Sequence, residues 1–600
     1  MVKRISLSIL NFLLCCVLSD AATAGYDVRN QEEFDACMKK AQAGEAVDIS
    51  LAEGEYVLKN CIIAKAAFSI HGNGATITYA NEKYSPEDAV RRTRDHYICK
   101  LKESIPVFSL FIDENGEILP VSESVQDDIR VNTCEQIEGE YNSKAGAELK
   151  IPIARNLSGL ANKVFSKAYG YFDCAWKEMD FRITGSDDTY FNVITLQSCN
   201  TGNFNYEKKS YKNDIRYVIF NAEPKAGSIY YDDEYIYIPT SFKEVEVISN
   251  DAWGKNTPTI DCRSSVSLSG LAFKNFNGIS VTSPSDCACS ISDCEFINTL
   301  SYALRVNKLS GDATVPVLIN GCRFVHCSVL CNNVVRLSSK AERRNCFEVR
   351  DCEINRYDDS FVGYKNCTGA LVVSADAVVD NCRIWNTPRC HVYINGGTVA
   401  FRNCTLYNTE QFNSFIERNL SSDLGLIYVN HFTNEADKAI NNTENVVLLE
   451  NNLLYGAYAY GQDACGIFID NGRGDVICRN NVVLDCQLYS IDARDAKSFV
   501  TTSSIRNRYE ANYLGSPFRL AAGEGVPEKD RPSLNGNIIL TDKKNILTRV
   551  KGNLEASAVP SINGAQDVTM ADKVAISAKT KKVIRKSSVF KKNKNRFILR

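Results

Sequence analysis

The stretch VRDCEINR at residues 349–356 returns in altered form as VDNCRIWN at 379–386 and as FRNCTLYN at 401–408. The shared pattern is an apolar residue, two variable residues, usually a Cys or Asn, one variable residue and a second apolar residue. Five further segments fit this pattern. Its fourth position falls at Leu271, Cys294, Cys322, Cys352, Cys382, Cys404, Asn452 and Asn481. Such a repeat indicates that one small structural unit is stacked many times.

The spacing and the alternation of the repeats predict their structure. Most steps between fourth positions are 22–30 residues, whereas the step from Cys404 to Asn452 is 48 and represents either one unit with a long loop or two units. Each unit holds two short alternating strands that meet at the fourth position and a third strand, such as HVYIN at 391–395 or GIFID at 466–470. Three strands per unit predict an all-β parallel solenoid, in which equivalent residues stack about 4.8 Å apart and the fourth positions form a buried ladder.

Composition restricts the class of protein. Among 600 residues, 69 Lys and Arg balance 72 Asp and Glu, which argues against a nucleic-acid partner. Lys3 and Arg4, the apolar run 5–18 and the small residues 22–24 predict a signal peptide over 1–24, and hence a secreted, periplasmic or cell-surface protein. No later apolar run is long enough for a membrane span. We expect a monomer without metal or cofactor, and some disulfides among the 24 cysteines.

Two segments carry a family resemblance. Residues 466–486, GIFIDNGRGDVICRNNVVLDC, are similar to a coil of bacterial glycan-degrading β-helices, and residues 28–77 are similar to their opening, with a capping helix followed by His-Gly-x-Gly. The sequence thus resembles the right-handed parallel β-helix superfamily of pectate lyases and related glycoside hydrolases. A helix is also expected from the residues themselves, because Asn30 can cap it and Gly44 can end it.

We expect five segments along the chain. After the signal peptide 1–24, residues 25–84 form the cap helix and the first coils, 85–255 an inserted antiparallel β-domain, 256–545 the main parallel β-helix with three strands per coil, and 546–600 a C-terminal extension with a basic tail. The insert is indicated by a hairpin turn at Asn115-Gly116 and by the alternating aromatic segment 227–239. A disulfide between Cys37 and Cys61 would join the cap to the first coil.

The outward residues of the third strands are the predicted binding surface. Alternation places them in a stripe with arginines at one end, aromatic rings in the middle and carboxylates at the other end. Flat rings beside polar groups suit the face and rim of a pyranose, so a polysaccharide or oligosaccharide is the expected partner. The predicted substrate-binding residues are Arg305, Arg336, Tyr393, Asn395, Tyr428, Asn430, Phe468 and Arg494.

Asp470 and Asp492 are the predicted catalytic pair. They lie on adjacent coils two residues out of register, which gives a backbone offset of roughly 8 Å and favours an inverting glycoside hydrolase. Asp358-Asp359 resembles the paired aspartates of polygalacturonase-like enzymes but lacks their accompanying motifs. Two other functions remain open: a lyase acting on a uronate-containing glycan, served by the arginines, and a glycan-binding or adhesin-type β-helix without catalysis.

Overall fold

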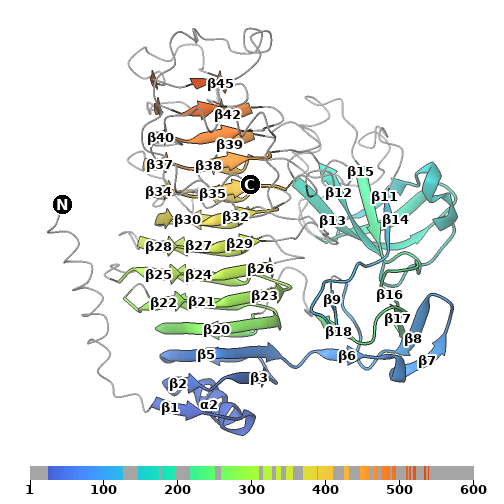
Figure 1. Cartoon of the computed structure of the whole chain (residues 1–600). Coiled ribbons are helices and arrows are strands. Elements are labelled where there is room, and N and C mark those ends of the chain that lie inside the picture. The colour runs from blue at the N-terminus through green and yellow to red at the C-terminus, as the bar shows by residue number, and fades with distance from the viewer. Residues whose placement is uncertain are drawn as a thin grey trace.

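The protein is described here from a computed structural model of the whole chain (Figure 1). The structure describes residues 25–107, 109–125, 146–174, 177–196, 216–249, 258–284, 286–309, 315–327, 333–339, 346–355, 369–387, 390–409, 412, 425–430, 446–457, 465–470, 475–484, 486, 489–494, 508–510, 512–514, 518–521, 533–535 and 538–539.

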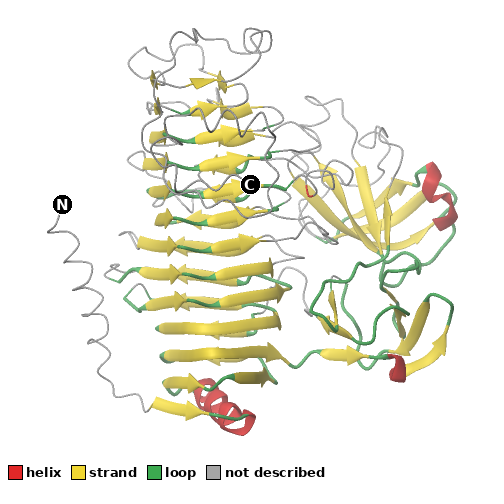
Figure 2. Cartoon of the chain, in the orientation of Figure 1, coloured by secondary structure: helices red, strands yellow, loops and turns green. Residues whose placement is uncertain are grey.

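The main body is a right-handed parallel β-helix with three strands per coil, as predicted (Figures 1 and 2). Its N-terminal end is covered by α2 (Gln31–Ala43), whose Phe34, Cys37, Met38 and Ala41 are buried in the core. Asn30 caps this helix by accepting a hydrogen bond from the Glu33 amide, and Gly44 ends it in the left-handed conformation. The helix therefore closes the apolar interior of the stack.

Two faces of the β-helix form one 23-stranded sheet, because β5 (Phe68–Tyr79) and β20 (Val266–Phe276) each pair with strands of both faces. The first face contains β1 (Gly25–Val28), β2 (Val47–Leu51), β22 (Cys289–Ser292), β25 (Val317–Asn320), β28 (Cys346–Arg350), β31 (Asp376–Asp380), β34 (Val399–Arg402), β37 (Val446–Glu450), β40 (Asp475–Arg479), β43 (Arg508–Glu510) and β46 (Ser533–Asn535). The second face contains β3 (Gly54–Leu58), β23 (Glu295–Thr299), β26 (Arg323–Cys327), β29 (Glu353–Asn355), β32 (Arg383–Trp385), β35 (Thr405–Tyr407), β38 (Leu453–Tyr455), β41 (Val482–Leu484), β44 (Tyr513–Leu514) and β47 (Ile538–Ile539).

The third face is an 11-stranded parallel sheet that carries the predicted binding stripe. Its strands are β4 (Ile62–Ala64), β19 (Ile260–Cys262), β21 (Ile279–Ser283), β24 (Leu304–Lys308), β27 (Asn333–Ser339), β30 (Gly369–Ser374), β33 (Val392–Ile394), β36 (Ile427–Asn430), β39 (Cys465–Asp470), β42 (Tyr489–Arg494) and β45 (Phe518–Ala521). Alternate residues of each strand are buried in the core, so the residues between them face outward.

The predicted ladder lies at the corner between the first and second faces. Asn481 Nδ2 donates to the Leu449 carbonyl at 2.9 Å, and Cys382 Sγ donates to the equivalent Val349 carbonyl at 3.7 Å. Cysteine therefore keeps the hydrogen bond to the preceding coil, although a thiol is the weaker donor. The long step from Cys404 to Asn452 is one coil, since the Cys404 amide donates directly to Asn452 Oδ1 at 2.9 Å.

The residue before most ladder positions takes the left-handed conformation and turns the chain through the corner. Its φ angle lies between 51° and 63° in every coil of this set: Gly270, Asp293, Gly321, Asp351, Asn381, Asn403, Asn451 and Asn480. Gly, Asn and Asp adopt this conformation at the lowest energetic cost. A Gly, Asn or Asp directly before the ladder position is therefore as diagnostic of a coil as the ladder residue itself.

The chain leaves the β-helix after β5, passes through an inserted antiparallel β-domain, and returns at β19. A six-stranded sheet contains β10 (Glu123–Val125), β15 (Arg216–Phe220), β12 (Tyr169–Cys174), β13 (Lys177–Ser186), β14 (Tyr190–Thr195) and β11 (Glu148–Pro152). Two smaller sheets contain β16 (Tyr230–Tyr231), β17 (Tyr235–Pro239), β8 (His96–Lys100) and β7 (Ala89–Arg92), and β6 (Glu82–Tyr84), β18 (Val245–Ile248) and β9 (Leu110–Asp113). Short 3-10 turns, η1 (Pro86–Asp88) and η2 (Arg155–Leu160), complete it.

The insert packs beside the β-helix (Figure 1). Leu300 and Phe412 of the β-helix chain share a buried apolar cluster with Tyr169, Phe220 and Ile248 of the insert. Across the same contact Asn298 Nδ2 donates to the Gly116 carbonyl at 2.9 Å. The hairpin turn predicted at Asn115-Gly116 thus contacts the β-helix.

The expected disulfide between Cys37 and Cys61 is wrong for this structure, in which both residues are free thiols. Cys37 packs into the core beneath α2, whereas Cys61 Sγ lies 4.0 Å from the Tyr79 hydroxyl. The helix turns Cys37 toward the coil interior because that is its apolar face, and this direction takes it away from a surface partner.

Candidate functional site

The predicted stripe runs along the outer side of the 11-stranded sheet as two parallel columns. In the first column Ser280, Arg305, Arg336, Val372, Tyr393, Tyr428, Phe468 and Asp492 are paired in register from coil to coil. In the second, Thr282, Asn307, Ser338 and Ser374 are paired, and so are Asn430, Asp470 and Arg494. Asn395 follows β33, where its amide donates to the Val373 carbonyl at 2.8 Å. The register therefore aligns nine of the ten predicted residues along one face, and Asn395 lies directly after β33.

The aromatic rings form a ladder rather than an open platform. The centroids of Tyr393 and Tyr428 are 5.1 Å apart with 17° between the planes, and those of Tyr428 and Phe468 are 5.2 Å apart with 15°. Both faces of the Tyr428 ring are therefore occupied by its neighbours. Tyr428 is only 7% exposed and Phe468 only 2%. A pyranose cannot stack on these two rings as we expected, because parallel register turns ring faces toward one another.

The rings belong to a second apolar cluster outside the core of the β-helix. Tyr428 and Phe468 pack there with Cys390, Cys465 and Tyr489. Asn430 holds the edge of the ladder, because its Nδ2 lies 3.0 Å from the Tyr428 hydroxyl and 3.3 Å from that of Tyr393. The stacked aromatic rings thus stiffen the middle of the stripe, up to the coil that carries Asp470.

The two predicted catalytic aspartates have the expected backbone relationship. Asp470 pairs with Asn430 on one side and Arg494 on the other, whereas Asp492 pairs with Phe468 and Arg519. Asp470 and Asp492 are thus one coil and two residues apart on the same face. Their side chains and that of Arg494 lie outside the described residues, as do both Asp358 and Asp359.

The other end of the stripe is cationic. Arg305 and Arg336 are direct neighbours in β24 and β27, and both side chains are half-buried. The Arg305 guanidinium lies 5.7 Å from the centre of the Tyr302 ring. The Nε atoms of both arginines are buried and have no hydrogen-bond acceptor among the residues that the structure describes.

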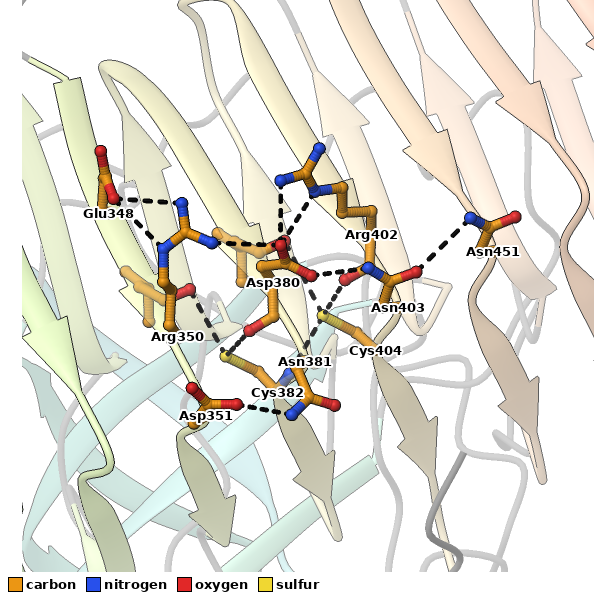
Figure 3. Close-up of polar contacts among 12 residues, drawn as sticks. Glu348, Arg350, Asp351, Asp380, Asn381, Cys382, Arg402, Asn403, Cys404 and Asn451 are labelled. Atoms are coloured by element: carbon orange, nitrogen blue, oxygen red, sulfur yellow. Dashed lines mark hydrogen bonds and ion pairs between the residues drawn. The ribbon is translucent and has the colours of Figure 1, made fainter. Parts of the chain in front are cut away.

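Charged residues on the first face are arranged differently, in mutually paired networks (Figure 3). Asp380 accepts from Arg350 at 3.2 Å, from Arg402 at 2.9 Å and from Asn403 at 2.7 Å. Arg350 also pairs with Glu348 at 3.1 Å. These charged groups already satisfy one another's hydrogen bonds. The network in Figure 3 therefore stabilises the contact between coils and is not a reactive site.

In the described part of the chain, no group of three or more His, Cys, Asp or Glu residues is arranged to hold a metal ion. Among the same residues no helix has the length and apolarity needed to cross a bilayer.

Comparisons with known proteins concern the fold. No family model and no curated protein matches the sequence. The solved structures that resemble it include a catalytic domain of a GH87 α-1,3-glucanase with tetrasaccharides, at 8% identity, 73% of this chain, 95% of that chain and a TM-score of 0.28. A tailspike of Pseudomonas phage phi297 has 11% identity, 80% and 73% coverage and a TM-score of 0.25. The catalytic unit of a GH87 α-1,3-glucanase from Streptomyces thermodiastaticus has 8% identity, 74% and 99% coverage and a TM-score of 0.23. At these values the likenesses assign no activity, and the strand register itself identifies the chain as a parallel β-helix with an inserted antiparallel β-domain.

Proposed function

We propose that this chain is a secreted carbohydrate-active β-helix protein, a glycoside hydrolase that cleaves a polysaccharide or oligosaccharide with Asp470 and Asp492. The observation that supports this most is the register of β39 and β42, which offsets the two aspartates by one coil and two residues. That offset amounts to about 8 Å between backbones. Carboxyl groups about 6.5–9.5 Å apart leave room for the attacking water of an inverting enzyme.

The register gives the two aspartates similar neighbours. Asp470 lies between Asn430 and Arg494, and Asp492 lies between Phe468 and Arg519, so each has one arginine beside it in the sheet. In an inverting mechanism one of the two carboxyl groups protonates the leaving oxygen and the other activates the attacking water.

The test replaces each aspartate without changing its size. Asp470→Asn and Asp492→Asn should each lower the release of reducing ends from a responsive glycan by a factor on the order of 10²–10⁴. Asp261→Asn is the matched control, because Asp261 lies in the same column of the same sheet but pairs with Arg263 at 2.9 Å. A screen of plant, algal and host glycans would identify the substrate. Full activity in both variants would disprove the assignment.

One observation favours a second candidate function. Arg305 and Arg336 lie on the stripe without an ion pair to any described residue. A lyase uses such cations to neutralise the carboxylate of a uronate before a base removes the neighbouring C5 proton. Lyase products carry a carbon–carbon double bond that absorbs ultraviolet light, whereas hydrolysis products do not. A protein that binds glycans and releases no product of either kind would instead be an adhesin-type β-helix.

A further inference from the structure

Arg305 and Arg336 differ from the other arginines of the β-helix. On the first and second faces, each arginine whose side chain is described contacts a carboxylate of its own or a neighbouring coil: Arg323, Arg350, Arg383, Arg402 and Arg479. Arg305 and Arg336 have no such ion pair with any residue that the structure describes. Among the described arginines of these three faces, Arg305 and Arg336 are thus the ones whose charge no carboxylate of the chain compensates.

The two unpaired arginines also lie in the least favourable relation to each other. They are exact partners in register, one coil apart, which is roughly 4.8 Å between backbones. Like charges directly opposite one another in a sheet repel. The nearest acidic residue of the column, Asp261, lies two coils before Arg305 and is occupied by Arg263 at 2.9 Å. An anion bound from outside the chain at the terminal nitrogens of the two guanidinium groups would relieve this repulsion.

The groups around the pair are hydrogen-bond donors. Ser280 precedes Arg305 in the first column, and Asn307 and Ser338 flank the pair in the second. Ser338 Oγ donates to Asn307 Oδ1 at 3.2 Å, which leaves the Asn307 amide group to present its N–H bonds away from Ser338. A surface that combines two guanidinium forks with hydroxyl and amide donors matches the oxygens of a carboxylate or sulfate.

We propose that Arg305 and Arg336 form an anion subsite that binds a carboxylate or sulfate group of the glycan, so that the substrate class is an acidic polysaccharide. This inference rests on the proposed function, because it assumes that the glycan lies along the stripe. Four coil steps separate Arg336 in β27 from Asp470 in β39, or about 19 Å. The acidic group is thus held several sugar units from the bond to be cleaved, and the bound molecule is a polymer aligned with the axis of the β-helix.

The experiment compares binding of three soluble polymers of similar length: a polyuronate, a sulfated galactan and a neutral glucan. Calorimetric titration of the full protein should give at least tenfold tighter binding of one acidic polymer than of the neutral one, and the preferred polymer distinguishes carboxylate from sulfate. The double variant Arg305→Gln/Arg336→Gln should lose at least tenfold in affinity for that polymer. It should also lose most of the salt dependence of binding. The control Arg323→Gln/Arg383→Gln removes the same charge from the second face and should bind within twofold of the wild type.

The outcomes separate this inference from the proposed function. Asp470→Asn should bind the acidic polymer as the wild type does. Binding of that polymer by the wild-type protein without any cleavage would refute the hydrolase while supporting the subsite. Cleavage of polymers with a higher KM and an unchanged kcat in the double arginine variant would support both. Equal binding of acidic and neutral polymers, or undiminished binding by the double variant, would overturn the subsite. A large loss of thermal stability in the double variant would also overturn it, because relieving like-charge repulsion should leave the melting temperature unchanged or higher.

Discussion

Replacing Asn481 by Ala should destabilise the β-helix far more than replacing a ladder cysteine. Asn481 is fully buried, and its side chain makes hydrogen bonds in both directions along the ladder. Its Oδ1 accepts from the Asn452 amide at 3.1 Å, while its Nδ2 donates to the Leu449 carbonyl at 2.9 Å and to Asn512 Oδ1 at 2.9 Å. Alanine would leave at least one backbone amide and one backbone carbonyl buried without partners.

The size of the effect follows from those two groups. Each buried polar group left unpaired costs about 1–3 kcal/mol, so Asn481→Ala should cost roughly 4 kcal/mol of unfolding free energy. Cys382→Ala removes a weak thiol donor, which lies 3.7 Å from the Val349 carbonyl and 3.4 Å from the Asp380 carbonyl, together with the volume of one sulfur atom. About 1–2 kcal/mol is expected there. Asn481→Cys should fall between the two, since the thiol retains a donor toward the preceding coil.

Guanidinium denaturation followed by circular dichroism measures these differences as shifts of the midpoint, and hydrogen exchange reports on the Asn452 amide directly. In Asn481→Ala that amide should lose protection even under conditions where the remaining coils are folded. Equal losses of stability in Asn481→Ala and Cys382→Ala would refute the reasoning. So would an unchanged exchange rate of the Asn452 amide.

Two further predictions concern single positions. His391 is fully buried, its Nε2 lies 2.9 Å from the Tyr407 carbonyl, and burial lowers its pKa from 6.5 to about 4. The unfolded chain binds this proton more readily than the folded chain does. The free energy of unfolding should therefore be highest above pH 6.5 and should fall by about 3 kcal/mol as the pH drops to 4. Urea titrations of the wild type and His391→Gln at pH 7 and pH 4.5 should show a smaller fall in the variant. Gly278 has a φ of 98°, and a Cβ there would collide with the Tyr302 carbonyl oxygen, so Gly278→Ala should lower the melting temperature sharply. Gly227 is the control, because it also has a positive φ but no atom near its missing Cβ. Gly227→Ala should therefore cost little more than the backbone strain.

The fold was readable from the sequence because a stacked structure repeats its constraints. The ladder at Cys382 and Asn481 is buried, and alternation in segments such as ALRVN fixes which side faces the core. The ladder also extends one coil further, to Asn512, whose Nδ2 donates to the Cys478 carbonyl at 2.8 Å. Residues 509–514, YEANYL, have the same apolar-x-x-Asn-x-apolar pattern as the eight units of the sequence, so this further coil was also predictable.

The site was less readable because its properties depend on neighbouring coils. Sequence alone aligned Tyr393, Tyr428 and Phe468, but it did not reveal that alignment itself covers the ring faces. It also could not distinguish the paired Arg350 from the unpaired Arg336, because their partners come from other coils. The exposure of the rings and the pairing of the arginines both depend on the register between strands of different coils. Variable loop lengths make that register hard to derive from the sequence.

The hydrogen bonds that Asn481 and Asn512 make to backbone groups are made to the preceding coil, and this gives assembly of the β-helix a direction. The side-chain amides of Asn481 and Asn512 reach back to the coil already in place, at Leu449 and Cys478, and accept from that coil's amides in return. Each turn that is added therefore completes the polar groups of its predecessor and presents one new incomplete edge. If folding begins at α2 and proceeds toward the C-terminus, only the last coil formed has ladder groups without hydrogen-bond partners. In this respect the chain resembles a filament that elongates from a stable nucleus at one end.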